Sequence, residues 1–121
     1  MLSLASTQRK ESLQLAFESK PLRTICESGD QAKNDLGEIV AETLKHRLAD
    51  LLAATSVQEL VAGRPRVLPE SQGKNMAVDL CDGRRLVFTA NHPSNPMTQD
   101  NNLDWSRVTR IRILRIEEDH G

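Results

Sequence analysis

The end of the chain combines arginines, carboxylates and a histidine within fourteen residues. The positions are Arg107, Arg110, Arg112 and Arg115, followed by Glu117, Glu118, Asp119 and His120. A histidine exchanges protons near neutral pH, and an arginine can hold a phosphate while negative charge builds on it. These residue types are suited to acid–base chemistry on a phosphate ester. The alternative is a frayed terminus with ordinary surface charge.

Arginine also dominates the positive charge of the whole second half. Residues 63–121 contain nine cations, and Lys74 is their only lysine. The planar guanidinium group of arginine can donate two parallel hydrogen bonds to a phosphate or a carboxylate, a property that a charge needed only for solubility does not require. The aromatic residues are Phe17, Phe88 and Trp105, with no tyrosine. A base-stacking platform of the kind used by RRM or OB domains is therefore not expected.

The chain lacks the sequence signatures of most enzyme classes and of membrane proteins. The chain has no Gly-rich phosphate loop, HExxH, GxSxG or CxxC. Cys26 and Cys81 are isolated from each other and from histidines, so we expect neither a disulfide nor a zinc site, and no cofactor. No apolar run approaches the roughly 20 residues of a membrane span, and charged residues interrupt residues 1–11 where a signal peptide would be apolar. We therefore expect a cytoplasmic protein.

The first half of the chain predicts one strand followed by helices. Residues 12–18 alternate between apolar and polar, which is typical of a half-buried strand. Pro21 then opens a short helix that ends near Ser28. From there to about Ala54, apolar residues recur every three or four positions, which predicts one long amphipathic helix with Gly37 inside it.

The second half predicts a sheet. Its expected strands are 75–81, 84–90 and a long final strand within 105–120, with a loop before the last one. The turn Asp82-Gly83 suits a two-residue hairpin, because both positions tolerate positive φ. In the final strand Ile111 and Ile113 face one way, while Leu114 and Ile116 face the other. This phase shift indicates either a bulge or a central strand that is buried on both faces.

Together these elements predict one α+β domain over residues 12–121. The N-terminal strand and the helices are expected to pack on a largely antiparallel sheet, which gives two layers. Residues 1–11 form an N-terminal extension, and whether it is ordered or disordered stays open.

Three segments resemble a known family. They are KPLRTICES…AETLKHRLADLLAATSVQELVAGRP, GKNMAVDLCDGRRLVFTANHPSNP and LDWSRVTRIRILRIEEDH, in that order. From about Leu13 to the end, the chain resembles the HigB-type killer toxins of type II toxin–antitoxin systems, within the RelE/ParE superfamily. The resemblance implies a RelE/ParE-like fold, a ribosome-dependent mRNA endonuclease that inhibits translation, and a role in plasmid maintenance. It also implies the ribosome, mRNA and a cognate antitoxin as partners.

The same resemblance implies which residues act. Cutting RNA without a metal uses the neighbouring 2′-OH as nucleophile, with a base, an acid and cations around the phosphate. Arg85 matches the arginine that the family places on the scissile phosphate, and His120 matches the histidine that ends the family's tail. Glu118 stands where the family usually has Asp, and Asp119 stands where it usually has Tyr. Either Glu118 and His120 suffice as base and acid, or the activity is weakened or lost.

Further candidates for RNA binding are Arg64, Arg66, Lys74, Arg84 and His92. For the cations the alternative is solvated loop charge, and for His92 it is packing within its loop. Two other functions stay open. One is a non-catalytic inhibitor of the gyrase-poison type, and the other is a degenerate toxin that only binds its antitoxin.

Overall fold

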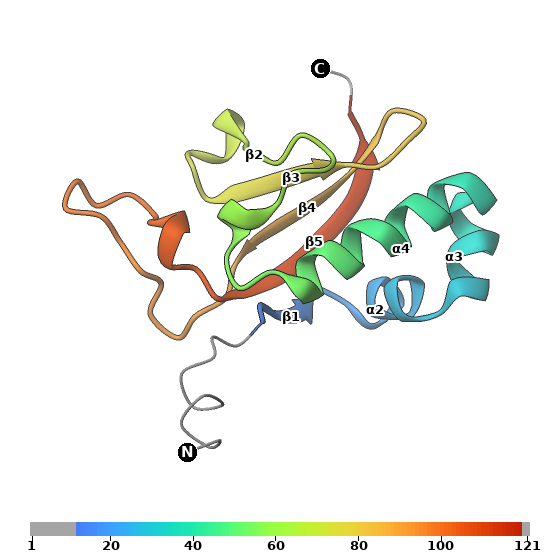
Figure 1. Ribbon diagram of the computed structural model, residues 1–121, viewed down its shortest axis with the longest axis horizontal. Helices are drawn as coiled ribbons and strands as arrows, with labels where there is room; N and C mark the ends of the chain where they lie inside the picture. The colour runs from blue at the N-terminus through green and yellow to red at the C-terminus, as the bar shows by residue number, and fades with distance from the viewer. Residues whose placement is uncertain (1–11, 120–121) are drawn as a thin grey trace, which may run out of the picture.

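The computed structural model describes residues 12–119 of the chain. Its helices are α2 (Lys20–Glu27), α3 (Gly29–Leu36) and α4 (Glu38–Ala53), with short 3-10 turns at Val57–Glu59, Pro69–Ser71 and Trp105–Arg107. Its strands are β1 (Gln14–Phe17), β2 (Arg66–Val67), β3 (Asn75–Asp79), β4 (Arg84–Ala90) and β5 (Arg110–Glu118). Figure 1 shows the helices gathered on one side of the sheet.

The five strands form a single mixed sheet in the order β1-β5-β4-β3-β2. β1 runs parallel to β5, and the other three pairings are antiparallel. The main core joins the helices to one face of this sheet, with Leu44 and Leu51 of α4 and Phe88 and Ile111 of the sheet among its fully buried members. The prediction of an α+β domain with a largely antiparallel sheet is therefore confirmed. Within residues 12–119 no α-helix covers the opposite face, and we call it the open face.

The prediction of one long helix from Ser28 to Ala54 is wrong. Two helices, α3 and α4, occupy this segment and meet at Gly37, which has a φ of 87°. Such a backbone is accessible to glycine and strained for other residues, so the helix ends there and a second one begins in a new direction. The apolar spacing predicted a continuous helix because Leu36 and Val40, on either side of the break, both pack against the core.

The phase shift in the last strand has the predicted cause. Val87 pairs with Arg115 and Phe88 pairs with Ile113, so Leu114 is an extra residue in β5. β5 is also an inner strand between β1 and β4. One detail of the prediction is wrong: after the bulge Ile116 returns to the helix-side core, while Leu114 packs against the small cluster of Leu68, Ala77 and Val87 on the open face.

The hairpin turn between β3 and β4 forms at the predicted residues, but its loop has three residues and not two, because Leu80 and not Cys81 lies opposite Arg84. Asp82 and Gly83 have φ values of 56° and 70°. This turn fixes the register, so that Asp79 lies opposite Arg85. Within residues 12–119, the structure contains no helix with the length and hydrophobicity that a membrane crossing requires.

Candidate functional site

The candidate site lies on the open face, at the end of the sheet near the β3–β4 turn. Asp79, Arg85 and Glu117 lie opposite one another on β3, β4 and β5. Residues in register project on the same face of a sheet, and their neighbours along each strand project on the other. Because Leu86 and Ile116 belong to the helix-side core, these three polar side chains face away from the helices.

Arg85 is enclosed by carboxylates. Its Nε donates to Glu117 Oε2 at 2.7 Å, and its Nη2 donates to Glu70 Oε2 at 3.2 Å. Its Nη1 lies 3.7 Å from Asp119 Oδ1. Only 13% of the side chain is exposed. All three nitrogens of this guanidinium group therefore face negative charge.

Asp119 lies among three arginines. Its Oδ2 is 3.0 Å from Arg66 Nη2 and 3.8 Å from Arg64 Nη2, while its Oδ1 faces Arg85. The backbone N–H of Asp119 donates to the Gly83 carbonyl at 2.6 Å, which places this residue beside the hairpin turn. The end of β5 and the β3–β4 turn thus meet at the arginines.

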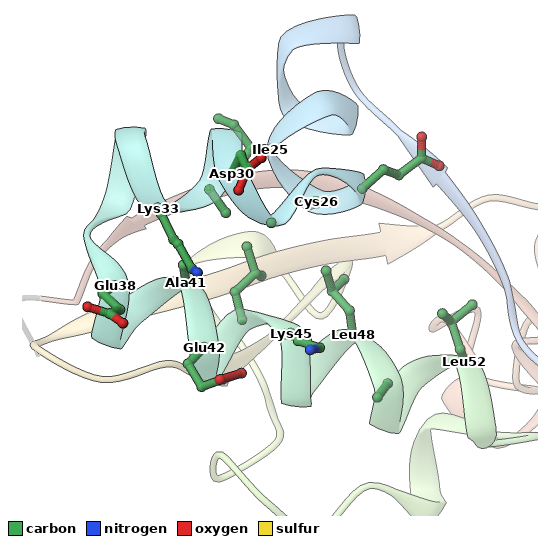
Figure 2. Close-up of a pocket in the computed structure, with 15 residues that line it drawn as sticks. Ile25, Cys26, Asp30, Lys33, Glu38, Ala41, Glu42, Lys45, Leu48 and Leu52 are labelled. Carbon is green, nitrogen blue, oxygen red and sulfur yellow. The ribbon is translucent and has the colours of Figure 1, made fainter.

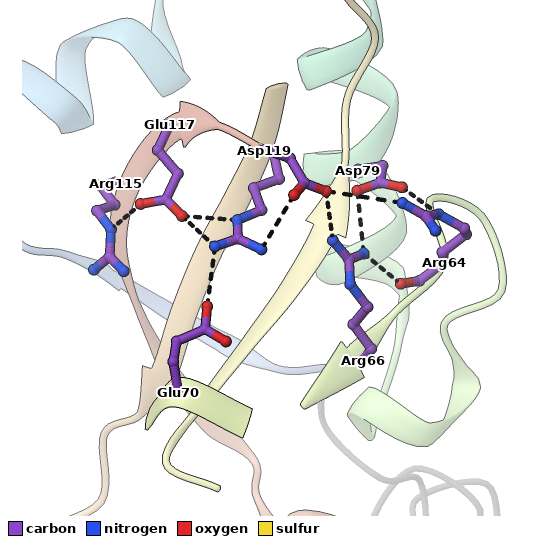
Figure 3. A network of polar contacts seen from close by, with 8 residues as sticks. Arg64, Arg66, Glu70, Asp79, Arg115, Glu117 and Asp119 are labelled. Carbon is purple, nitrogen blue, oxygen red and sulfur yellow. Dashed lines mark hydrogen bonds and ion pairs between the residues drawn. The ribbon is translucent and has the colours of Figure 1, made fainter. Parts of the chain in front are cut away.

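Further ion pairs extend these contacts into one network, which Figure 3 shows. Asp79 accepts hydrogen bonds from Arg64 and Arg66, and Glu117 also accepts one from Arg115. In the part of the chain that the structure describes, this network joins Arg64, Arg66, Arg85 and Arg115 to Glu70, Asp79, Glu117 and Asp119. We call it the arginine–carboxylate network. Four positive charges balance four negative ones, so it is neutral as a whole.

The charged forms of Arg85 and Glu117 stabilise each other. Partial burial alone would raise the pKa of Glu117, but hydrogen bonds from Arg115 and Arg85 outweigh it and hold this pKa below its ordinary value. Burial would likewise lower the pKa of Arg85, yet the hydrogen bond from Arg85 to Glu117 and the attraction between the two charges raise it. Both groups are ionised at neutral pH.

Of the predicted catalytic and RNA-binding residues, the structure brings together Arg64, Arg66 and Arg85. Arg84 and Glu118 lie opposite each other one position further along the strands. The strand alternation therefore directs both toward the helix-side face, away from Arg85. His120 lies outside the described residues and follows Asp119 in the sequence.

Lys74 and His92 flank the other end of the β3–β4 pair, where Asn75 lies opposite Thr89. From Arg85 to Ala90 alone the strand extends about 17 Å, at 3.3 Å per residue. His92 Nε2 accepts the backbone N–H groups of Thr109 and Arg110 at 3.0 and 3.3 Å. Burial and the charge of Arg110 lower the pKa of His92, so its neutral form joins the loop to the start of β5. Neither residue belongs to the arginine–carboxylate network.

Sequence reasoning missed most carboxylates of the arginine–carboxylate network. Glu70 and Asp79 were not singled out, and Glu117 was seen only as part of an acidic tail. The signal that could have found Glu117 and Asp79 is strand pairing. A two-residue loop at Asp82-Gly83 would place Asp79 opposite Leu86, whereas the observed loop of three residues, 81–83, places it opposite Arg85. Glu70 comes from a 3-10 turn between β2 and β3, and no periodic pattern in the sequence predicts its position beside Arg85.

A hollow of about 530 Å³ lies away from this network, between α4 and the pair α2 and α3, as Figure 2 shows. Ile25, Leu44 and Leu48 line it together with Cys26. Burial, followed by the charge of Glu27, raises the pKa of the Cys26 thiol to about 11, so the sulfur is a poor nucleophile at neutral pH. Among residues 12–119, no group of three or more His, Cys, Asp or Glu side chains is placed to hold a metal ion.

The fold and the site define an α+β domain with a polar network on the open face of its sheet. No protein-family model, curated protein or solved structure matches this chain.

Proposed function

We propose that this chain is the toxin of a type II toxin–antitoxin system and cuts mRNA on the ribosome until a cognate antitoxin inhibits it. The sequence resemblance to the HigB-type toxins supports this proposal. The single observation that carries it is the convergence of Arg64, Arg66 and Arg85 on the carboxylate of Asp119, directly before His120 in the chain. Three arginines gathered around one anion suit an RNA phosphate.

In the proposed reaction the 2′-oxygen of one nucleotide attacks the adjacent phosphorus, and the bond from phosphorus to the 5′-oxygen of the next nucleotide breaks. A base takes the proton of the 2′-OH, and an acid protonates the leaving 5′-oxygen. The products are a 2′,3′-cyclic phosphate and a 5′-OH. Arg85 stabilises the negative charge that builds on the phosphorane, and His120 and Glu118 provide the acid and the base.

This assignment places a condition on the end of β5. While Glu118 is paired with Arg84, its side chain projects on the face opposite to that of Arg85. Glu118 serves as a base beside Arg85 only when the end of the strand leaves this register. The same movement withdraws Asp119 from the arginines.

A second candidate function is a degenerate toxin that binds its antitoxin without cutting RNA. The observation that favours it is the enclosure of Arg85 by Glu70, Glu117 and Asp119. An RNA phosphate that approaches Arg85 meets these carboxylates, which repel it.

Inducible expression of wild type and His120→Ala in bacteria, with primer extension on a reporter mRNA, tests the proposal. His46→Ala is the matched control, because this histidine lies on the exposed side of α4. We expect growth arrest with new mRNA ends for wild type and His46→Ala, and neither for His120→Ala. Arrest with intact mRNA and DNA damage would favour a gyrase-type target. Folded protein that causes no arrest would favour the degenerate toxin.

A further inference from the structure

We propose that the guanidinium groups of Arg64, Arg66 and Arg85 form a binding site for one phosphodiester, and that the Asp119 carboxylate is a built-in competitor for this site. The inference rests on the proposed RNA substrate and specifies how this chain holds it. It assigns to Asp119 a role in setting RNA affinity.

The geometry around Asp119 is that of an anion site. Its two carboxylate oxygens face different guanidinium groups: Oδ2 faces Arg66 and Arg64, and Oδ1 faces Arg85. The two non-bridging oxygens of a phosphodiester share a negative charge in the same way. A phosphodiester in place of Asp119 therefore presents one oxygen to each side of the site.

The fit of Asp119 to this site is loose. Its oxygen lies within hydrogen-bond distance of Arg66, at 3.0 Å, but its contacts to Arg64 and Arg85 are 3.8 and 3.7 Å. Glu117, by contrast, accepts a hydrogen bond from Arg85 at 2.7 Å. Hydrogen bonds between nitrogen and oxygen lie at 2.7 to 3.2 Å, so a larger anion can engage Arg64 and Arg85 more closely than Asp119 does.

Asp119 is also the carboxylate that the fold can release most easily. Glu117 and Asp79 belong to paired strands, where their positions are fixed by the ladder on both sides of Arg85. Asp119 follows the last residue of β5, and its backbone N–H donates to the Gly83 carbonyl just beyond the last strand pair. Strand ends open at a small cost in free energy, compared with the centre of a sheet.

The charge balance selects the class of ligand. The arginine–carboxylate network is neutral with Asp119 in place, and the loss of this one carboxylate leaves a single positive charge. A phosphodiester carries one negative charge and restores the balance. A terminal phosphate carries about 1.5 to 2 negative charges at pH 7, which is more than the single positive charge of the site. The site is therefore matched to the internal backbone of a nucleic acid.

Binding of a 2′-O-methyl RNA hexanucleotide to the full chain tests this inference, measured by fluorescence anisotropy. The probe lacks the attacking 2′-OH and cannot be cut, so the assay reports binding separately from cleavage. The variants are Asp119→Asn, which removes the competing charge, and Asp82→Asn as the matched control. Asp82 lies on the nearby hairpin turn, where it and Asp119 line a hollow of about 290 Å³, and asparagine tolerates its φ of 56°.

We expect Asp119→Asn to bind the probe about tenfold more tightly than wild type. In wild type the Asp119 carboxylate occupies the site most of the time, and this competition is absent in the variant. Asp82→Asn is expected to change the affinity less than about twofold, because its carboxylate is exposed and screened. Arg66→Gln in the Asp119→Asn background is expected to abolish the gain. Circular dichroism verifies folding, and Asp119→Ser replaces Asp119→Asn if the latter fails to fold.

Three results would overturn the inference. The first is equal affinity of wild type and Asp119→Asn, including the absence of binding by both. The second is an equal gain in Asp82→Asn, which would indicate general charge repulsion. The third is a gain that requires a 5′-phosphate on the probe, which would indicate a site for terminal phosphates. None of them decides whether the wild type cuts mRNA in cells, so failure of this inference and failure of the proposed function are distinguishable.

Discussion

Arg85 on β4 and Glu117 on β5 lie directly opposite each other, and Arg85 Nε donates to Glu117 Oε2 at 2.7 Å. Both side chains are largely shielded from solvent, with 13% and 26% exposed. Removal of one partner leaves the other charge without one of its close ionic contacts. Arg85 is thus a structural element of the sheet as well as the candidate contact for RNA.

This relationship predicts that Arg85→Gln destabilises the fold by about 1 to 2 kcal/mol, because Glu117 and Asp119 then repel each other without the cation between them. Arg85→Gln with Glu117→Gln is expected to recover at least half of that loss. Urea unfolding of the two variants and of wild type measures the difference. A double variant that is less stable than Arg85→Gln would refute the assignment. The double variant is also the better one for testing loss of toxicity, because it separates activity from folding.

The break between α3 and α4 predicts opposite effects for two glycine substitutions. Gly37→Ala is expected to lower the free energy of unfolding by about 1 to 3 kcal/mol, because alanine is strained at a φ of 87°. Gly29→Ala, at the start of α3, is expected to raise it by about 0.5 kcal/mol, because a Cβ there meets nothing within 4 Å. Thermal unfolding of both variants checks this. Equal stability of the two would show that Gly37 is not required at the junction.

His92 predicts a loss of stability on acidification. Its pKa is lowered in the folded chain, so below the ordinary value of 6.5 the unfolded chain binds the proton more readily. The stabilising contribution of neutral His92 is therefore complete above pH 6.5 and falls as the pH drops through its lowered pKa. Urea unfolding at pH 7.5 and pH 5.5 is expected to show a larger loss for wild type and His46→Gln than for His92→Gln. The same loss in all three proteins would exclude His92 as the cause.

Two adjacent leucines on α4 distinguish the buried stripe from the exposed one. Leu51 is 0% exposed and Leu52 is 55% exposed. Leu51→Ala is expected to cost about 2 to 5 kcal/mol of stability through the cavity it leaves, and Leu52→Ala less than about 1 kcal/mol. Denaturant midpoints measure both. Similar costs at the two positions would contradict the orientation of α4.

Local patterns predicted most of the fold because each was set by a short stretch of chain. The alternation in residues 84–90 and the turn at Asp82-Gly83 specify a hairpin without reference to the rest of the chain. The phase shift at Leu114 likewise predicted either a bulge or a central strand, and β5 has a bulge and lies between β1 and β4. The break at Gly37 escaped prediction because apolar spacing alone does not distinguish a continuous helix from two helices that pack on the same core.

The site was harder to predict because it depends on register between distant strands. Arg64 and Arg66 could be chosen by residue type, and Arg85 by the resemblance to the toxin family. The pairing that sets Glu117 beside Arg85 and turns Glu118 toward the other face depends on how β5 aligns with β4, and the bulge at Leu114 shifts that alignment by one residue. An error of one residue in register exchanges the two faces of a strand.

The chemistry of RNA ends formed in a purified translation reaction tests the central claim most directly. The reaction contains ribosomes, a defined mRNA and either wild type or His120→Ala. We expect wild type to produce upstream fragments that end in a 2′,3′-cyclic phosphate or a 3′-phosphate, with a 5′-OH on the downstream fragments, and His120→Ala to produce neither. Intact mRNA with folded wild-type protein, or fragments that end in a 3′-OH, would contradict cleavage by attack of the 2′-OH at this site.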